Sequence, residues 1–528
     1  MTSSRSATSE VETTAEVRVA DVIRRAAESR PEVVALRHGE RVVTYAELDE
    51  RSNRLAQALL GEGSGPGARI AYLGRSAPEV IELLAAVSKI GAVIVPLNWR
   101  LSPRELANVL ADSGAPLLVA DTAYEEMARG LVAGAETPVA LRVLGTDGAD
   151  AYEPWLAAHA ADDPGGRGEP SDVVVQMYTS GTTGAPKGVL TTHRNLAAAA
   201  ATSARWRFNE TTVSLTPLPL FHIGGIGWVY CGLWHGATTI LVSEFDAAAV
   251  LDLLERHLVT NPIFVPTMLQ MLTAVPGAPG RDFSALRTIV YGASPITTTV
   301  LRATLATFGC ELIGLYGLTE STGGVVHLDG RDHDADGPRQ HLLRSAGRPY
   351  EWVDLRVVDP TTGEQVPTGA VGEVWLRAPN IMAGYFQRPD DTAAALTSDG
   401  WLRTGDGGYL DEEGYLFLTD RVKDMIISGG ENVYPIEVEE VLSQHPGVAE
   451  VTVVGVPDEH WGESVRALVV RRPGSDLDAA ALIDFARQRL AGYKLPRAVD
   501  FVDGFPRTPT GKVLKRELRE RLGRADRC

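Results

Sequence analysis

The residues best suited to chemistry begin with a loop rich in glycine and hydroxyl groups. The run Tyr178-Thr-Ser-Gly-Thr-Thr-Gly-Ala-Pro-Lys-Gly-Val189 follows a hydrophobic stretch that predicts a strand. Glycines let backbone N–H groups approach an anion closely, hydroxyl groups donate to phosphate oxygens, and Lys187 supplies a positive charge. The loop is not a Walker A motif, because Gly188 follows the lysine where that motif needs serine or threonine. The pattern predicts a phosphate-binding loop, and a plain polar turn is the alternative.

Three further segments have residue types that can stack on a ring, bind a cation, accept hydrogen bonds or let a group approach the backbone closely. Tyr316 can stack on a base, and the nearby Glu320 offers a hard oxygen ligand to a hard cation. Asp406 ends a Trp-Leu-Arg-Thr-Gly-Asp segment and can accept two hydrogen bonds from neighbouring hydroxyl groups. The pair Gly429 and Gly430 lets a ligand pass close to the backbone. Taken singly, these residues also suit a core tyrosine, a turn aspartate and a glycine turn.

Together these motifs resemble those of the adenylate-forming superfamily, which holds acyl-CoA synthetases, peptide-synthetase adenylation domains and firefly luciferase. The resemblance runs from about residue 20 to residue 520, with the motifs in the order and spacing of the family. Its most specific part is the segment from Asp420 to Pro435, Asp-Arg-Val-Lys-Asp-Met-Ile-Ile-Ser-Gly-Gly-Glu-Asn-Val-Tyr-Pro. Sixteen residues follow Lys512, so no carrier domain is expected there. The chain is therefore most similar to the stand-alone acyl-CoA synthetases.

The resemblance implies a role for each matching residue. Lys512, Thr319, Glu320 and His222 are the implied catalytic residues, Glu320 is the implied Mg²⁺ ligand, and Asp420 is the implied hinge. A satisfied structural histidine is the alternative for His222. The implied ATP-binding residues are Thr179, Ser180, Gly181, Thr182, Thr183, Gly184, Lys187, Ala293, Ser294, Tyr316, Gly317, Thr319, Asp406, Arg421 and Lys512. The implied CoA or pantetheine channel holds Lys423, Gly429, Gly430 and Lys494, and the implied acyl pocket holds His222, Gly224, Gly225, Gly292, Gly323 and Gly324.

The implied reaction has two half-steps. A carboxylate attacks the α-phosphate of Mg·ATP to give an acyl-adenylate and pyrophosphate, and a lid then rotates so that CoA displaces AMP. The glycines leave space for a chain or ring, and no cation is evident for a second carboxylate, which favours a fatty or aromatic monocarboxylate over malonate. One alternative is an acceptor other than CoA, such as an amine, a carrier-protein thiol or a small inorganic nucleophile. A luciferase-like oxygenase and a non-catalytic nucleotide-binding protein are the others.

The elements that must position these residues alternate between strands and helices. Thr44 begins a capping box that predicts a helix, and residues 69–74 predict a buried strand. Residues 78–90 predict an amphipathic helix, and residues 92–96 predict the next strand. Strands that alternate with helices indicate an α/β protein with doubly wound, parallel sheets.

The pattern changes along the second half of the chain. Residues 331–346 predict an exposed loop, and residues 353–418 predict short strands of a β subdomain. Combined with the resemblance, these patterns predict a large N-terminal domain over residues 17–419 that binds AMP and the acyl group. They also predict a small, mobile α+β lid domain over residues 420–528.

The net charge is distributed unevenly between these two predicted domains. The chain carries −18, yet residues 421–528 hold 17 basic and 17 acidic residues, so the preceding part carries the entire net charge. Such a protein is not expected to coat nucleic acid or to bind an anionic membrane, because both need a cationic surface. ATP, pyrophosphate and CoA are anions, so their attraction must be local, and the lid is expected to bring cations.

Cysteine content and hydropathy bound the location of the protein. Cys231, Cys310 and Cys528 are widely spaced, which predicts neither a disulfide framework nor a zinc site. The first sixteen residues are polar and lack the apolar segment of a signal peptide, and no apolar stretch reaches the length of a membrane span. A cytoplasmic enzyme without integral membrane association is expected, with a carboxylate, ATP and CoA as partners, and a homodimer stays open.

Overall fold

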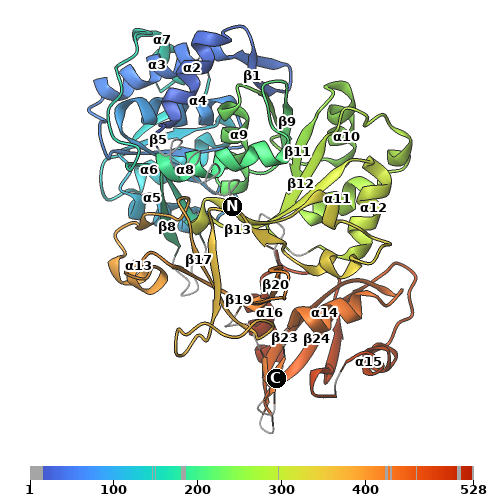
Figure 1. The fold of residues 1–528 in the computed structure, drawn as a ribbon. Coiled ribbons are helices and arrows are strands. Elements are labelled where there is room, and N and C mark those ends of the chain that lie inside the picture. Colours follow the sequence, from blue (N-terminus) through green and yellow to red (C-terminus); the bar gives the residue numbers. More distant parts are fainter. Residues whose placement is uncertain are drawn as a thin grey trace.

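The computed structural model describes residues 16–145, 147–148, 150–179, 186–294, 296–421, 426–428, 431–433, 435–458, 461–490, 492–507 and 513–525. The strands of this part of the chain form four sheets. Figure 1 shows a large body and, at the bottom of the view, a smaller group of elements from the C-terminal end of the chain. The predicted α/β fold with a large N-terminal and a small C-terminal part is confirmed.

One sheet of the body contains the predicted phosphate-loop strand. Its described strands lie in the order β18-β8-β7-β4-β3-β5-β6, parallel from β7 through β6, while β8 and β18 are antiparallel to their neighbours. The bounds are β3 Arg69–Leu73, β4 Val93–Leu97, β5 Leu117–Ala120, β6 Ala140–Val143, β7 Val173–Thr179, β8 Lys187–Thr192 and β18 Gly384–Tyr385. Its helices are α4 Pro78–Ile90, α5 Pro103–Ser113, η1 Thr122–Tyr124, α6 Glu125–Ala133 and α7 Tyr152–Ala157.

A second, larger sheet lies beside the first in the body. Its described strands follow the order β15-β14-β13-β12-β11-β9-β10-β1-β2, and the pairs from β1 through β13 along this path are parallel. The strands are β1 Val34–His38, β2 Arg41–Thr44, β9 Val213–Thr216, β10 Thr238–Leu241, β11 Asn261–Phe264, β12 Thr288–Gly292, β13 Glu311–Leu318, β14 Gly323–Leu328 and β15 Arg348–Pro349. The helices around these strands are α2 Val19–Ser29, α3 Tyr45–Gly61, α8 His193–Ala201, η2 Thr202–Trp206, α9 Ile223–Trp234, α10 Ala247–Arg256, α11 Pro266–Thr273, η3 Ala278–Gly280, α12 Thr298–Phe308, η4 Thr319–Ser321, η5 Gly330–Asp332 and η6 Gln340–Arg344.

The helix α4 shows how local sequence and burial act together in the body. Its predicted bounds are confirmed: Pro78 begins it, and Gly91 ends it with a φ of 72° in the left-handed region. The prediction that it is amphipathic is wrong, because every residue of α4 is buried. Its polar side chains have polar partners instead of water: Lys89 Nζ lies 2.7 Å from Asp49 Oδ1, and Glu82 Oε1 accepts a hydrogen bond from the Arg51 guanidinium.

The predicted β subdomain is confirmed as an antiparallel sheet in the order β16-β17-β19-β20. The prediction of an exposed loop at residues 331–346 is wrong. Asp332 is 3% exposed and Leu342 is fully buried, because η5 and η6 fold this segment back onto the body. The bounds are β16 Asp354–Val358, β17 Gly372–Arg377, α13 Pro389–Ala395, β19 Leu402–Leu410 and β20 Leu416–Arg421.

The C-terminal elements have hydrophobic cores of their own. The described strands run β22-β21-β24-β23, with β25 parallel to β24, and α14 lies against β23. Arg344 at the end of η6 forms a 2.5 Å ion pair with Glu440 of α14, which joins the body to this part. The bounds are β21 Ile426–Ser428, β22 Glu431–Val433, α14 Pro435–Ser443, β23 Val448–Asp458, β24 Gly462–Arg471, α15 Ala479–Arg487, η8 Gly492–Lys494, β25 Ala498–Phe501 and α16 Lys515–Ala525.

One large hydrophobic cluster joins the two sheets of the body. It includes Ile23 and Leu55 from the first helices, Ile94 from the seven-strand sheet, and Val326 and Leu402 from later strands. Burying aliphatic side chains of this size contributes about 1.5–3 kcal/mol each. No helix in the described part of the chain is long and apolar enough to cross a membrane.

Candidate active site

The predicted phosphate loop connects two antiparallel strands at the edge of the seven-strand sheet. Thr179 ends β7, Lys187 begins β8, and the two residues are paired in the register of this hairpin. Four consecutive buried residues of β7, from Val174 to Met177, anchor the hairpin in the core. The predicted residues Ser180, Gly181, Thr182, Thr183 and Gly184 lie outside the described residues, so Lys187 marks the site.

The Lys187 side chain is held between a carboxylate and an aromatic ring. Its Nζ lies 2.5 Å from Asp391 Oδ1, and the Tyr385 ring centroid is 5.1 Å away. Tyr385 is in place because β18 pairs with β8, with Tyr385 opposite Val189, and Asp391 lies in the first turn of α13. The Lys187 side chain is only 15% exposed, so this positive charge is partly withdrawn from water.

Glu320, the predicted metal ligand, is hydrogen-bonded to the same tyrosine, Tyr385. The Tyr385 hydroxyl donates to Glu320 Oε1 at 2.9 Å, and the backbone N–H of Met382 donates to the Glu320 carbonyl at 2.8 Å. The Asn380 amide donates to the Ser321 carbonyl at 2.8 Å, which fastens the short helix η4 to the segment before β18. Lys187 and Glu320 therefore both interact with Tyr385. The lysine ammonium group lies near its ring, and the glutamate carboxylate accepts a hydrogen bond from its hydroxyl group.

The donor set around Glu320 suits a magnesium ion that is also bound by phosphate. Within the described residues no three histidine, cysteine or acidic side chains gather into a metal cluster. Magnesium in nucleotide sites is usually held by one or two carboxylates together with substrate phosphates and water. A single carboxylate, with one oxygen oriented by Tyr385, fits that pattern.

Tyr316 and Asp406 meet between the larger sheet and the β subdomain. The Tyr316 hydroxyl on β13 donates to Asp406 Oδ2 on β19 at 2.8 Å. The Asp406 backbone N–H donates to Thr404 Oγ1 at 3.0 Å, and the backbone of Asp406 pairs with that of Arg421. An ionised carboxylate has about four acceptor positions, so the hydrogen bond from Tyr316 alone does not saturate Asp406.

The turn after β12 follows a strand that pairs with β13, the strand that carries Tyr316. A side chain at Gly292 would meet the Leu315 carbonyl oxygen at 2.7 Å, so the pairing of β12 with β13 requires glycine there. Ala293 has a φ of 70°, a left-handed conformation that is costly for a residue with a Cβ atom. Ser294 follows it, half-buried. Such strain at Ala293 is typical of a turn that is shaped for a ligand.

His222 precedes α9 and is a neutral imidazole. Burial, with a smaller contribution from the charge of Arg100, lowers the pKa of His222 to about 4. Its ring centroid lies 4.5 Å from that of Phe221. Among the described residues, no hydrogen-bond partner is found for its buried Nε2 atom. An unpartnered buried nitrogen is unusual and is compatible with a ligand contact.

Comparison with known proteins identifies the family. The AMP-binding enzyme profile matches residues 23–386, and the profile of the AMP-binding enzyme C-terminal domain matches residues 437–512. The chain belongs to the AMP-binding enzymes. The prediction of an adenylate-forming enzyme, made from the motifs, is confirmed.

Individual relatives of this AMP-binding enzyme differ in what their names say they act on. The chain is 42% identical to the fatty acid–[acyl-carrier-protein] ligase ScoC of Streptomyces coeruleorubidus, over 94% of this chain and 95% of ScoC. It is 43% identical to a feruloyl-CoA synthase of Amycolatopsis, over 94% of this chain and 98% of the relative. The structure of the amide bond synthetase McbA from Marinactinospora thermotolerans matches with a TM-score of 0.87, 35% identity and coverage of 96% and 99%.

The predicted acyl-pocket glycines of this AMP-binding enzyme differ in how much space the structure leaves for a side chain at each position. A side chain at Gly225 would collide with the Pro219 carbonyl oxygen, so the start of α9 requires glycine for packing. At Gly224 a side chain would meet Leu218 at 3.1 Å, and at Gly324 it would meet Leu315 at 3.3 Å. Gly323, with a φ of 101°, faces open space. Gly317, which pairs with Gly324 across the hairpin, has no room for a side chain, because a Cβ atom there would meet the Gly323 carbonyl oxygen.

Most of the remaining predicted residues belong to the C-terminal part, and Thr319 belongs to the body. Lys494 Nζ contacts both carboxylate oxygens of Glu437, at 2.6 and 2.7 Å. Thr319 is half-buried at the start of η4. The predictions for Lys423, Gly429, Gly430 and Lys512, and for the side chains of Asp420 and Arg421, fall outside what the structure describes.

Three residues near the site were missed by the sequence motifs. Tyr385 orients Glu320, Asp391 pairs with Lys187, and Asn380 fastens η4. Tyr385 and Asp391 lie 65 and 204 positions from the residues that they touch, and Asn380 lies 59 positions from Ser321, in a segment with no periodic or motif signal. Only the pairing of β18 with β8 brings this segment to the site.

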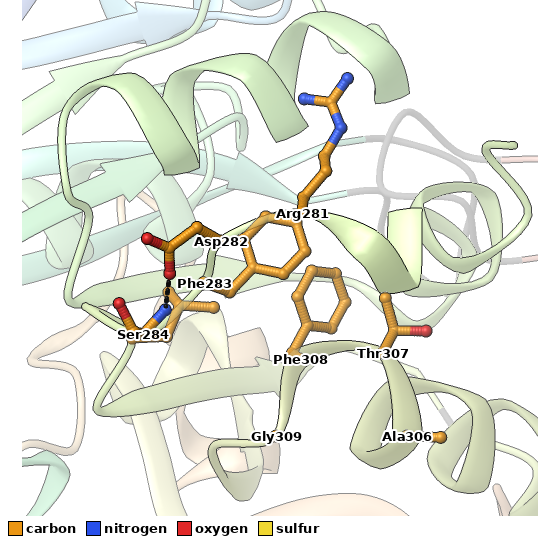
Figure 2. A pocket seen from close by; sticks show the side chains of 9 residues that line it. Arg281, Asp282, Phe283, Ser284, Ala306, Thr307, Phe308 and Gly309 are labelled. Carbon is orange, nitrogen blue, oxygen red and sulfur yellow. Dashed lines mark hydrogen bonds between the residues drawn. The ribbon is translucent and has the colours of Figure 1, made fainter. Parts of the chain in front are cut away.

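A surface hollow elsewhere in this AMP-binding enzyme contains none of the predicted site residues. Figure 2 shows the residues that line it, among them Arg281, Asp282 and Phe283, and Phe308 at the end of α12. The Asp282 carboxylate accepts a hydrogen bond from the Ser284 backbone N–H at 3.0 Å, drawn as a dashed line. Its polar groups are thus engaged locally, and the hollow is not the candidate active site.

Proposed function

We propose that this AMP-binding enzyme activates a fatty or aromatic monocarboxylic acid with Mg·ATP and transfers the acyl group to CoA. The observation that carries the proposal is the arrangement of one lysine and two carboxylates, which would suit phosphate, a metal ion and ribose, on two tyrosine side chains. Lys187 and Glu320 share Tyr385, while Asp406 is held by Tyr316. A nucleoside triphosphate with its metal ion needs these three kinds of group together.

In the first half-reaction the substrate carboxylate oxygen attacks the α-phosphorus of ATP, the bond to the bridging oxygen breaks, and pyrophosphate leaves. Lys187 neutralises the negative charge of the phosphates, and Asp406 accepts hydrogen bonds from the ribose hydroxyl groups. Glu320 would hold Mg²⁺, which supplies charge stabilisation at the phosphates. The reaction needs little proton transfer, so its rate depends on positioning and preorganised charge.

In the second half-reaction the thiolate sulfur of CoA attacks the acyl carbon and AMP leaves. The neutral state of His222, with its pKa near 4, suits a residue beside the reacting acyl group that donates or accepts a hydrogen bond without adding charge. We also propose that residues 420–528 form the mobile lid, with Asp420 as the hinge, and that Lys512 reaches the α-phosphate during adenylation. The channel for CoA is proposed at Lys423, Gly429, Gly430 and Lys494. A cytoplasmic location and a homodimer stay predictions.

The names of two similar proteins support a second candidate for the acceptor. ScoC is named a ligase to an acyl-carrier protein, and McbA is named an amide bond synthetase. An acceptor other than CoA leaves the adenylation half-reaction unchanged. The proposal of CoA draws on the feruloyl-CoA synthase and on relatives named indoleacetate–CoA ligase and long-chain-fatty-acid–CoA ligase.

The deciding experiment measures pyrophosphate and AMP release over a panel of carboxylates, with and without CoA. Octanoate, benzoate-type acids and malonate cover the proposed and the disfavoured classes. We expect pyrophosphate release with octanoate or an aromatic acid, and AMP release that depends on CoA. Turnover of malonate above both other classes would contradict the proposed substrate. AMP release with an amine or an acyl-carrier protein, and none with CoA, would establish the second acceptor.

A further inference from the structure

The contact between Lys187 and Asp391 places a negatively charged carboxylate beside the lysine that is proposed to bind the phosphates of ATP. Lys187 Nζ lies 2.5 Å from Asp391 Oδ1, and their side chains are 15% and 35% exposed. Asp391 is fixed by the first turn of α13, whose Thr392 hydroxyl accepts from the Tyr385 backbone N–H at 2.9 Å. The helical turn that carries Asp391 is therefore tied to β18, the strand that carries Tyr385.

The phosphates of ATP and the carboxylate of Asp391 compete for one ammonium group. Lys187 begins β8 and its ammonium group already lies near the Tyr385 ring, so its reach toward phosphate is limited by the pair. While the pair is intact, an incoming phosphate meets a neutralised lysine and a nearby carboxylate of its own charge. Both effects weaken the binding of phosphate, and both disappear when the carboxylate is replaced by an amide.

We propose that Asp391 is a resting counter-ion of Lys187 that the phosphates of ATP must displace, and that it thereby sets the affinity of the enzyme for the nucleotide. The inference rests on the proposed function, because it takes Lys187 as the phosphate-binding lysine. When a binding-competent state is only partly populated, the apparent dissociation constant rises by the inverse of its population. For a partly buried ion pair we expect the unpaired state to hold about a tenth to a third of the molecules.

The chain offers a matched control next to the residue tested. Asp390 precedes Asp391 in the same helical turn but is exposed. Asp390→Asn therefore makes the same change in net charge without touching the Lys187 pair. Asp391→Glu keeps the carboxylate, and Asp391→Ser removes it with a smaller side chain. Thermal unfolding of each variant checks that the fold is retained.

The experiment measures binding of Mg·ATP and of adenosine to the full-length protein by isothermal titration calorimetry. We expect Asp391→Asn and Asp391→Ser to bind ATP about threefold to tenfold more tightly than the unaltered protein. Asp391→Glu and Asp390→Asn should stay within about twofold of it, a difference below that of a weak ion pair. Adenosine, which has no phosphate, should bind equally to all variants.

Two results separate a failure of this inference from a failure of the proposed function. If the unaltered protein binds ATP and Asp391→Asn binds it no more tightly than Asp390→Asn does, Asp391 is not a competing counter-ion and the inference falls alone. The same holds if Asp391→Asn weakens binding or if Asp391→Glu tightens it equally. If the unaltered protein binds no ATP, both the proposed function and the inference are wrong. If Asp391→Asn does not fold, the comparison of the serine and glutamate variants decides.

Discussion

Removing the hydroxyl group of Tyr316 tests whether Asp406 holds the ribose of ATP. Tyr316→Phe keeps the ring that is expected to stack on adenine and deletes the hydroxyl group that donates to Asp406 Oδ2 at 2.8 Å. The carboxylate then loses a donor that fixes its rotation. It must be re-oriented each time a ribose binds, so the nucleotide should bind less tightly while the chemistry of the bound substrate is unchanged.

The expected size of the effect follows from the kind of hydrogen bond. A hydrogen bond to a charged group contributes about 1.5–3 kcal/mol when it is buried. Tyr316 and Asp406 are both half-buried, and water can replace part of the lost donor, so we expect about 1 kcal/mol in nucleotide binding. That free energy corresponds to about a fivefold increase in the KM for ATP.

The assay compares two nucleotides in the pyrophosphate exchange reaction. With ATP, Tyr316→Phe should raise KM about fivefold and leave kcat unchanged within about twofold. With 2′,3′-dideoxy-ATP, which offers Asp406 no hydroxyl group, the two proteins should have equal KM values. The control for the loss of a tyrosine hydroxyl group near the site is Tyr409→Phe. Tyr409 lies on β19, the strand of Asp406, and its ring stacks on Phe417. An equal penalty with both nucleotides would refute the assignment of Asp406 to the ribose.

Three further outcomes are expected. Tyr385→Phe frees Glu320 Oε1 and should raise the Mg²⁺ concentration needed for half-maximal nucleotide binding about fivefold, measured by calorimetric titration; an unchanged requirement would remove Tyr385 from metal positioning. Lys512→Ala should abolish adenylation and spare thiolation of a supplied acyl-adenylate, and equal loss in both assays would contradict its role. His193 is buried, with Nδ1 accepting from the Val19 N–H, and burial lowers its pKa to about 4. The unfolded chain therefore binds this proton first as pH falls below about 6.5, and stability should drop by about 2 kcal/mol between pH 7 and pH 5 in urea unfolding. His193→Gln should lose that part of the pH dependence, and an unchanged slope would contradict it.

Much of the fold could be predicted because local signals and burial agree in these segments. The capping box at Thr44 and the Pro78 and Gly91 ends of α4 specify helix limits through interactions a few residues apart. The prediction that failed was the exposure of the polar side chains of α4, because all of them are buried. Lys89 and Glu82 are the residue types that normally face water, and only partners on distant segments make their complete burial possible. No periodicity within α4 carries that information.

The site was predictable where a motif supplies its own geometry and unpredictable where tertiary contacts complete it. Lys187 and Glu320 belong to runs whose composition suits phosphate and metal. Tyr385 and Asp391 reach them only because β18 pairs with β8, a contact between segments almost 200 residues apart. A tyrosine in a short strand and an aspartate in a short helix give no signal of such a role by residue type alone.

The separation of the hydrophobic cores bears on how such proteins can recombine. The large cluster of the body includes residues as far as Leu416, and the clusters of the C-terminal part begin at Ile426; among the described residues no side chain belongs to both. A crossover between these two positions would exchange the C-terminal part between relatives without cutting a core. The contacts that a chimera must preserve include the pair of Arg344 with Glu440. Relatives can therefore exchange the C-terminal part without rebuilding the hydrophobic core of the body.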